Sequence, residues 1–456
     1  MKRLKRLMYR TVCAGLSAIM PLGLACAADL LDVYRLAQLN DPGFEAARYT
    51  LAAAQQKIPL ARAGLLPVVA ATGNDGRTQA NTAFSTAPAL QRDVNTWNWT
   101  LQLTQPVIRI QNLYAYSESE SIVEQATAQF AQAEQELVLR VARVYFDVVV
   151  AEDGIAVADA QLRAMGEQLA IAKRGFQAGT TTVTDVHEAQ SRIDLARAQR
   201  VAALNELETK RSELEKVVGQ LPTRLAVLRP SVVAPRPAPD DPEAWISQAK
   251  DNNPLVRAQQ AALMAAESAV KKFRSEHLPT VDFTASYGGN YASGSLTTPV
   301  DYSTQARSKA LGVQLNIPIF SGGATNARVA EAVSNRHKTR ADLEAARRQA
   351  ASDARQAYAG ITNGLAQIEA LDSAVLSGES AVKGNQVGYT LGIRINIDVL
   401  NAEQQLYTTQ RDLSKARYET LFQGLKLKAA AGVLSEDDLS ALNGLLGPRL
   451  LEAQAG

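Results

Sequence analysis

Cysteine is nearly absent from this chain, which has two cysteines in 456 residues, Cys13 and Cys26. Both lie in an N-terminal segment with a basic start, an apolar stretch over residues 11–24 and an Ala-Cys-Ala cleavage site, which together indicate a secretory signal at residues 1–27. Cleavage after Ala27 leaves no cysteine, which excludes disulfides, thiolate metal sites and cysteine nucleophiles. It also removes five basic residues and no acids, so the formal charge falls from +2 to −3.

The start of the chain has two other interpretations. A transmembrane anchor fails on length, since spanning a bilayer takes about 20 consecutive apolar residues. A lipid-modified N-terminus at Cys26 is the second alternative, although Gly23-Leu24-Ala25 lacks a leucine at the usual place before the cysteine.

Histidine and glycine-rich motifs are also scarce, and their scarcity argues against catalysis. The three histidines, His187, His277 and His337, are isolated, with no second histidine at metal-ligand spacing. Gly322-Gly323 follows a strand pattern but lacks G-x-G-x-x-G and the lysine of a phosphate-binding loop. The chain has no basic stripe of the kind that binds nucleic acid. The sequence therefore predicts a protein that is not an enzyme and holds no cofactor or metal.

Proline is missing from two long tracts, between Pro106 and Pro222 and between Pro318 and Pro448, and aromatic residues make up only 5% of the chain. In both tracts apolar and small residues recur every three or four positions, which predicts very long helices with narrow packing faces. In the first tract these positions are Val141, Val144, Val148, Ala151, Ile155, Ala158, Leu162, Met165, Leu169, Ala172 and Phe176. A single helix over residues 110–177 would be about 100 Å long at about 1.5 Å per residue.

The chain repeats itself. Asp41-Pro42 recurs as Asn253-Pro254 and Leu66-Pro67 as Leu278-Pro279, each at an offset of 212 residues. The stretches 176–190 and 389–404 correspond at an offset of 213, so the chain is a tandem duplication. We expect a first repeat at residues 28–220, a proline-rich linker at 221–241, a second repeat at 242–432 and a C-terminal segment and tail at 433–456.

Each repeat opens with a helical segment, residues 30–64 and 242–276, which we expect to break once, before the proline of Asp-Pro or Asn-Pro. After this segment, apolar residues recur at every second position. Residues 97–104, 281–288 and 311–316 alternate apolar with polar side chains and predict strands with one apolar face. The repeat adds a fourth strand at residues 68–77. Polar loops are expected at residues 78–95 and 290–308.

The stretches 176–190 and 389–404 predict tight turns that connect each long helix to a returning helix. Gly179 and Gly392 suit the left-handed position just past a helix end. Asp185 and Asp398 suit the first turn of the following helix, where an acid complements the helix dipole. The returning helices are expected over residues 185–219 and 398–432.

An exported chain without a spanning helix but with four two-faced strands suggests an outer-membrane β-barrel. Four strands cannot close a barrel, so several copies must complete it. The expected fold class is a helical coiled-coil barrel plus a transmembrane β-barrel. The alternative, from another class, is a non-channel periplasmic helical scaffold with a small β-domain.

The sequence resembles the TolC-like outer-membrane channel-tunnels over about residues 29–447. The resemblance is carried by D-L-L-D-V-Y from Asp29, the L-L-P ending at Pro67, Q-L-T-Q-P ending at Pro106, P-I-F-S-G-G from Pro318 and Y-x-x-G-x-R-x-x-x-D-V-L from Tyr389. It implies a homotrimer with a twelve-stranded barrel in the outer membrane and a helical tunnel across the periplasm. It also implies an inner-membrane ABC or proton-driven transporter and a periplasmic adaptor as partners, for export of proteins or small molecules.

The resemblance further implies a gate at the paired turns, formed by Tyr389, Arg394, Thr184 and Asp185. It places the narrowest point of the pore at Asp398. The family carries a second acid three residues later, where this chain has Asn401, so a single acidic ring is expected and cation preference should be weaker. The residues themselves also permit a plainer interpretation, in which Asp185 and Asp398 are helix-start acids and Arg394 is a solvated cation.

Overall fold

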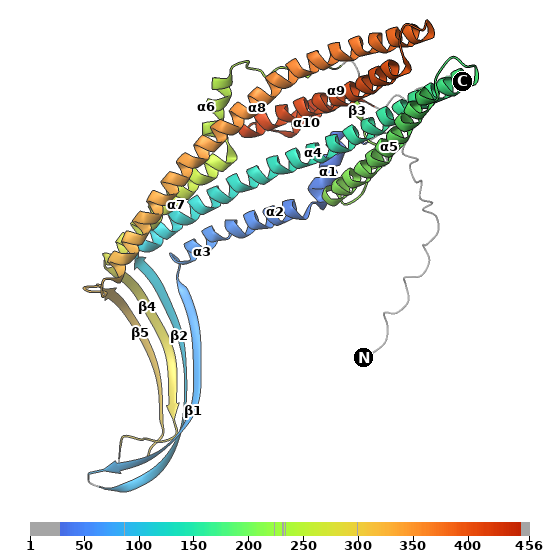
Figure 1. Cartoon of the computed structure of the whole chain (residues 1–456). Coiled ribbons are helices and arrows are strands. Elements are labelled where there is room, and N and C mark those ends of the chain that lie inside the picture. The colour runs from blue at the N-terminus through green and yellow to red at the C-terminus, as the bar shows by residue number, and fades with distance from the viewer. Residues whose placement is uncertain are drawn as a thin grey trace, which may run out of the picture.

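The computed structural model describes residues 28–447 apart from Thr86, Thr223, Pro230, Ser231, Val233 and Pro299. The expected signal segment, the alternative at Cys26 and the tail beyond Gly447 lie outside these residues. The molecule is elongated (Figure 1), with a curved sheet at one end and two long helical hairpins that run from it to the opposite end. Short helices lie along the hairpins between these ends.

Each repeat opens with short helices whose starts are capped by side chains. In the first repeat these are α1 (Leu30–Asn40), α2 (Pro42–Gln55) and α3 (Lys57–Ala63). In the second they are α6 (Pro242–Asn252), α7 (Pro254–Arg274) and the 3₁₀ turn η1 (Ser275–His277). Asp41 and Asn253 each accept a hydrogen bond from a backbone N–H of the next helix, which begins with proline at its first position.

The expectation of a single break in the first helical segment was wrong, because a second break lies at Gln56. Pro59 explains it. Proline has no N–H to donate to the carbonyl four residues earlier, and its ring crowds that carbonyl, so a continuous helix through Gln55 is disfavoured.

One antiparallel sheet joins the two repeats. Its strands are β1 (Val68–Phe84), β2 (Ala87–Ile108), β4 (Thr280–Ala292) and β5 (Thr304–Asn316), in the order β1-β2-β4-β5. Trp97 pairs with Tyr291 in the register between β2 and β4, which belong to different repeats. Alternate apolar side chains of β5 are exposed, with Leu311 at 79% and Val313 at 70%. The four strands expected from the sequence are confirmed.

The loop expected at residues 78–95 was wrong, because strand pairing continues through almost all of it, from Thr78 opposite Val94 to Thr82 opposite Leu90. Backbone hydrogen bonds stabilise a ladder whatever side chains it carries, so a polar hairpin can continue without an apolar face. Asp93 adds cross-strand hydrogen bonds to Arg77 and Gln79. The second expected loop is shortened to the residues between Ala292 and Thr304.

The two hairpins have the predicted lengths. The long helices are α4 (Ile110–Gln177), with 68 residues, and α8 (Ala324–Thr390), with 67. The returning helices are α5 (Val183–Val218) and α9 (Asn396–Ala430). None of these helices, nor any other in the part of the chain described, combines the length and apolarity needed to cross a bilayer.

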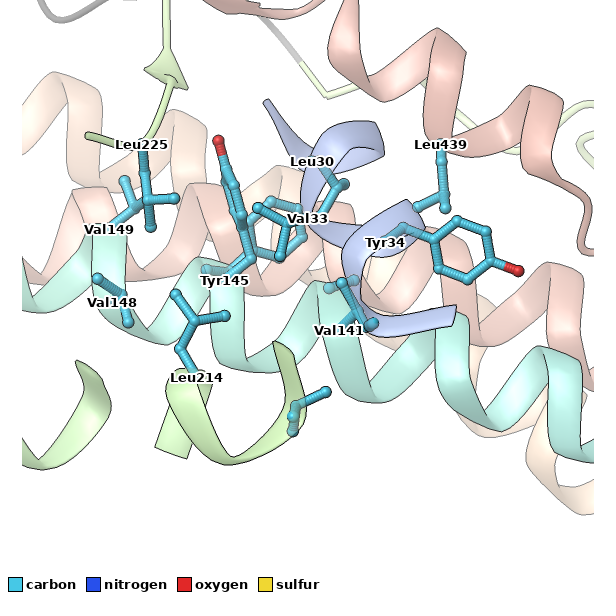
Figure 2. Close-up of a cluster of buried hydrophobic side chains, with 14 of the residues drawn as sticks. Leu30, Val33, Tyr34, Val141, Tyr145, Val148, Val149, Leu214, Leu225 and Leu439 are labelled. Atoms are coloured by element: carbon cyan, nitrogen blue, oxygen red, sulfur yellow. The ribbon is translucent and has the colours of Figure 1, made fainter. Parts of the chain in front are cut away.

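The largest apolar core lies where the short helices pack on the hairpins. Tyr145 of α4 is fully buried there, and its hydroxyl donates to the backbone carbonyl of Ala226 at 2.7 Å. Figure 2 shows Leu30 and Val33 of α1 on one side of this ring and Val148, Val149 and Leu214 on the other. The C-terminal helix α10 (Glu436–Asn443) adds Leu439, and β3 (Val227–Leu228) pairs with β6 (Leu446–Gly447). This core joins the last described elements, α10 and β6, to the first, α1.

Candidate gate at the paired turns

The two hairpins end in turns of the same geometry. We call residues 178–182 the first turn and residues 391–395 the second turn. Gly179 and Gly392 have φ values of 74° and 73°, in the left-handed region that both were predicted to occupy. The carbonyl of Gly175 accepts from the N–H of Thr180 at 2.9 Å, and that of Gly388 accepts from Ile393 at 2.8 Å. These bonds satisfy carbonyls that helix ends otherwise leave unpaired.

A glycine one turn before each of these residues makes room for the returning chain. A Cβ at Gly388 would lie 2.7 Å from Cγ of Arg394, and a Cβ at Gly175 would lie 2.7 Å from Cγ2 of Thr181. Both distances are shorter than side chains tolerate. The stem of Arg394 is therefore held against the last turn of α8.

Asp185 forms the capping box that starts α5. Its Oδ2 accepts from the backbone N–H and the hydroxyl of Thr182, both at 2.8 Å, while its own N–H donates to Thr182 Oγ1 at 3.2 Å. The plainer interpretation of Asp185 as a helix-start acid is thus realised in this chain. Thr184, one residue earlier, is exposed beside it.

Arg394 lies next to Asp398 and not next to Asp185 in the single chain. Its Nη1 is 3.7 Å from Asp398 Oδ2, and its side chain is 57% exposed. Tyr389 is within electrostatic range of Asp185 on the other hairpin. Burial raises the pKa of its hydroxyl, and the charge of Asp185 raises this pKa further. Tyr389 and Asp185 are therefore within electrostatic range, while the tie from Arg394 to Thr184 and Asp185 stays a prediction.

Asp398 and Asn401 share an open hollow on one face of α9, lined also by Arg394, Asn385 and Gln405. The side chain of Asn401 is bound from the other hairpin. Arg192 of α5 donates from Nη2 to Asn401 Oδ1 at 2.8 Å and from Nη1 to Gln404 Oε1. This contact could not be predicted from the sequence, because nothing in the spacing of Arg192 relates it to residues more than 200 positions later.

A buried carboxyl lies on the opposite face of α9. Glu403 is 3% exposed, and its Oε1 accepts from Gln168 of α4 at 3.2 Å and from Gln386 of α8 at 3.0 Å. Burial is the main reason that the pKa of Glu403 is raised above its usual value. Sequence reasoning missed this residue as well, although an acid on the apolar side of a periodic helix could have marked it.

Among residues 28–447 that can be described, no cluster of three or more His, Cys, Asp and Glu side chains is arranged to hold a metal ion. The chemistry at the turns consists of charged and amide groups that form reversible contacts. Such groups can hold helices together or attract ions.

A sheet with apolar positions that suit lipid, continued by two hairpins whose long helices have 68 and 67 residues, is the architecture of an outer-membrane channel-tunnel. Residues 33–220 and 245–433 each match the family described as Outer membrane efflux protein. The chain belongs to this family, as the resemblance predicted.

Individual relatives agree with this assignment. The chain is 34% identical to the alkaline protease secretion protein AprF of Pseudomonas aeruginosa over 421 residues, which cover 91% of this chain and 86% of AprF. It is 30% identical to the outer membrane protein TolC of Escherichia coli over 459 residues, covering 98% of this chain and 90% of TolC. The crystal structure of VceC from Vibrio cholerae superposes with a TM-score of 0.76 at 18% identity, covering 88% of this chain and 96% of VceC.

These findings confirm the fold class, the outer-membrane localisation and the channel function predicted from the sequence. They favour the channel over the periplasmic scaffold, because the family and the relatives are channel proteins.

Proposed function

We propose that the chain forms a homotrimeric export duct, which receives cargo from an inner-membrane transporter through a periplasmic adaptor. The main support for this proposal is that the sheet is open, with an unpaired edge on each side. In the order β1-β2-β4-β5, β1 and β5 are edge strands, and exposed edges are not tolerated in lipid. Copies of the same chain can pair β5 of one with β1 of the next. The repeats, taken as residues 28–220 and 242–432, would each supply two strands and one hairpin.

The width of the barrel supports three copies, the number that the resemblance implies. Two copies would give a barrel of about eight strands, whose interior side chains fill. Three copies give about twelve strands and a wider barrel, because barrel diameter grows with strand number. Trimers that resist heat in detergent, together with single-channel conductance in planar bilayers, would support the duct. A soluble monomer without conductance would refute it.

The gate is proposed to lie at the paired turns, where Arg394 binds Thr184 and Asp185 with help from Tyr389. Three features support this. The Arg394 guanidinium is exposed and more than a hydrogen-bond length from Asp398, so its donors remain available. The negative charge of Asp185 already raises the pKa of Tyr389. Arginine offers five donors in a geometry that suits a carboxylate and a hydroxyl.

Removing this arginine should loosen the closed end. Each hydrogen bond to a charged group contributes about 1.5–3 kcal/mol. Arg394→Ser, alone or with Tyr389→Phe, should therefore raise bilayer conductance and sensitise cells to large antibiotics. Arg411→Ser is the matched control, because Arg411 lies further along α9 and pairs with the adjacent Asp412. Unchanged conductance in the double variant would count against this gate.

The pore aperture is proposed to lie at Asp398. Threefold symmetry would bring three copies of this carboxylate around one axis, and charges roughly 7 Å apart repel by about 2 kcal/mol per pair at an effective dielectric near 20. A cation in the ring relieves this repulsion. Asn401 adds no charge to the ring, so the preference for cations depends on Asp398 alone.

Protein is the cargo we propose, delivered by a transporter that supplies the energy. The relative at 34% identity is named for the secretion of an alkaline protease. Deleting the gene should abolish one or more secreted proteins from the culture medium, and restoring it should return them. Unchanged secretion together with increased sensitivity to small toxic molecules would assign the duct to efflux instead.

A further inference from the structure

Glu403 joins three helices near the turns. It belongs to α9, while the amides that it binds come from α8 of the same hairpin and α4 of the other. Both amide nitrogens donate to the same carboxyl oxygen, Oε1. A relative movement of the two hairpins must therefore break the bond between Glu403 and Gln168.

The remaining polar atoms of this contact have no partner. Within the described part of the chain, Glu403 Oε2 and Gln168 Oε1 are both buried and make no hydrogen bond. Two acceptors cannot bond to each other, and a buried unpaired acceptor is costly. A proton on Oε2 makes it a donor. The protonated carboxyl and the Gln168 amide can then pair through two hydrogen bonds, one in each direction.

Burial is the largest effect on the pKa of Glu403, and it favours this neutral form. The hydrogen bonds from Gln386 and Gln168 lower the pKa, and the carboxylate of Glu167 on α4 raises it. On α9, Tyr407 lies within electrostatic range of both Glu403 and Arg163 of α4. The facing α8 group is the neutral amide of Gln386. On α5, Arg192 directs its donors to Asn401 and Gln404.

We propose that Glu403 is a proton-controlled latch, which holds the two hairpins of one protomer together when neutral and releases them when ionised. The proposal rests on the duct function, in which the hairpins separate when the tip opens. Separation admits water, and the carboxyl returns to its ordinary pKa of about 4.3. With the hairpins together, burial raises that pKa.

The direction of the pH effect follows from these two states. The latch is fully effective below the ordinary pKa, where the carboxyl is protonated in both states. Its contribution is lost as the pH rises through the raised pKa of the closed state. Between the two values, each pH unit changes the ratio of closed to open forms by up to about tenfold per carboxyl. Raising the pH should therefore favour the open tip.

The test is the open fraction of purified trimers in planar bilayers, from about pH 5 to about pH 9. The wild type should open more as the pH rises. Glu403→Gln should stay closed and lose this dependence, because its amide is neutral and can donate to Gln168 Oε1. Gln168→Leu should open at every pH. Glu167→Gln is the control, since it removes an exposed charge beside the latch and should keep a pH-dependent profile.

A wild-type profile in Glu403→Gln, or a wild type whose opening does not change with pH, would overturn the latch. Infrared difference spectra provide a readout that does not need conduction. A buried protonated carboxyl should absorb in the closed wild type and be missing from Glu403→Gln. If the trimer never conducts but this band is present, the duct proposal fails alone. If Arg394→Ser opens the pore and the band is missing, the latch fails alone.

Discussion

Replacing Arg192 by alanine should weaken the contact between the two hairpins of each protomer. Arg192 lies on α5 and bonds Asn401 and Gln404 on α9, so its guanidinium is a direct link between the first hairpin and the second. Alanine removes both hydrogen bonds and leaves two amide oxygens that water can reach.

The cost of the substitution follows from the two hydrogen bonds that are lost. A hydrogen bond to a charged group contributes about 1.5–3 kcal/mol. Because Asn401 is exposed and water competes for it, about 1 kcal/mol for each bond is appropriate here. The loss of both costs about 2 kcal/mol per protomer, which corresponds to about a 30-fold shift toward separated hairpins.

The assay is the open fraction in planar bilayers, combined with a double-mutant cycle between Arg192→Ala and Asn401→Ala. The two substitutions should be coupled by about 1 kcal/mol. Arg197→Ala is the control, because Arg197 pairs with Asp194 on its own helix. If the effects of Arg192→Ala and Asn401→Ala simply add, or if Arg197→Ala opens the pore as much, this link does not hold the hairpins together.

Three further predictions address other regions. Asp398→Ala should abolish cation preference and block by trivalent cations, seen as reversal potentials in a salt gradient; wild-type selectivity would place the acidic ring elsewhere. Tyr145→Phe should lose the bond to Ala226 and about 1 kcal/mol of stability, read as a lower urea midpoint; an unchanged midpoint would contradict this. Arg109 donates to the two carboxyl oxygens of Asp282 at 2.8 and 2.6 Å. Asp282→Asn should weaken this pair by about 2 kcal/mol and lower the temperature at which trimers dissociate. An unchanged dissociation temperature would argue against that role.

Local features of the fold could be predicted from the sequence because each depends on a few neighbouring residues. The absence of proline and the regular apolar spacing predicted α4 at its full length. A glycine past each long helix predicted the left-handed turn positions. The strand β1 was predicted only from the duplication, because its own apolar and polar side chains alternate poorly.

Errors arose where pairing and backbone chemistry outweigh side-chain pattern. The polar residues 78–95 carry no strand pattern, and they form strands because backbone bonds extend an existing hairpin. The break at Gln56 follows from Pro59, a signal that was present in the sequence and was missed.

The candidate site could be predicted only in part. The turns and the acids at the starts of α5 and α9 were located by spacing. Which side chains meet between hairpins could not be predicted, because contacts such as Arg192 with Asn401 and Gln168 with Glu403 join residues more than 200 positions apart. Helical periodicity describes one helix at a time and does not indicate which helix packs against it.

The length of β2 affects how the protein meets the outside of the cell. Its 22 residues extend about 70 Å at about 3.3 Å each, or about 50 Å in height when tilted by about 45°. The apolar band of an outer membrane is about 25 Å tall. The polar hairpin at residues 78–95 is therefore long enough to rise clear of the bilayer as a stiff, solvated rim. Large molecules that approach the cell from outside would meet this rim before they reach the lipid.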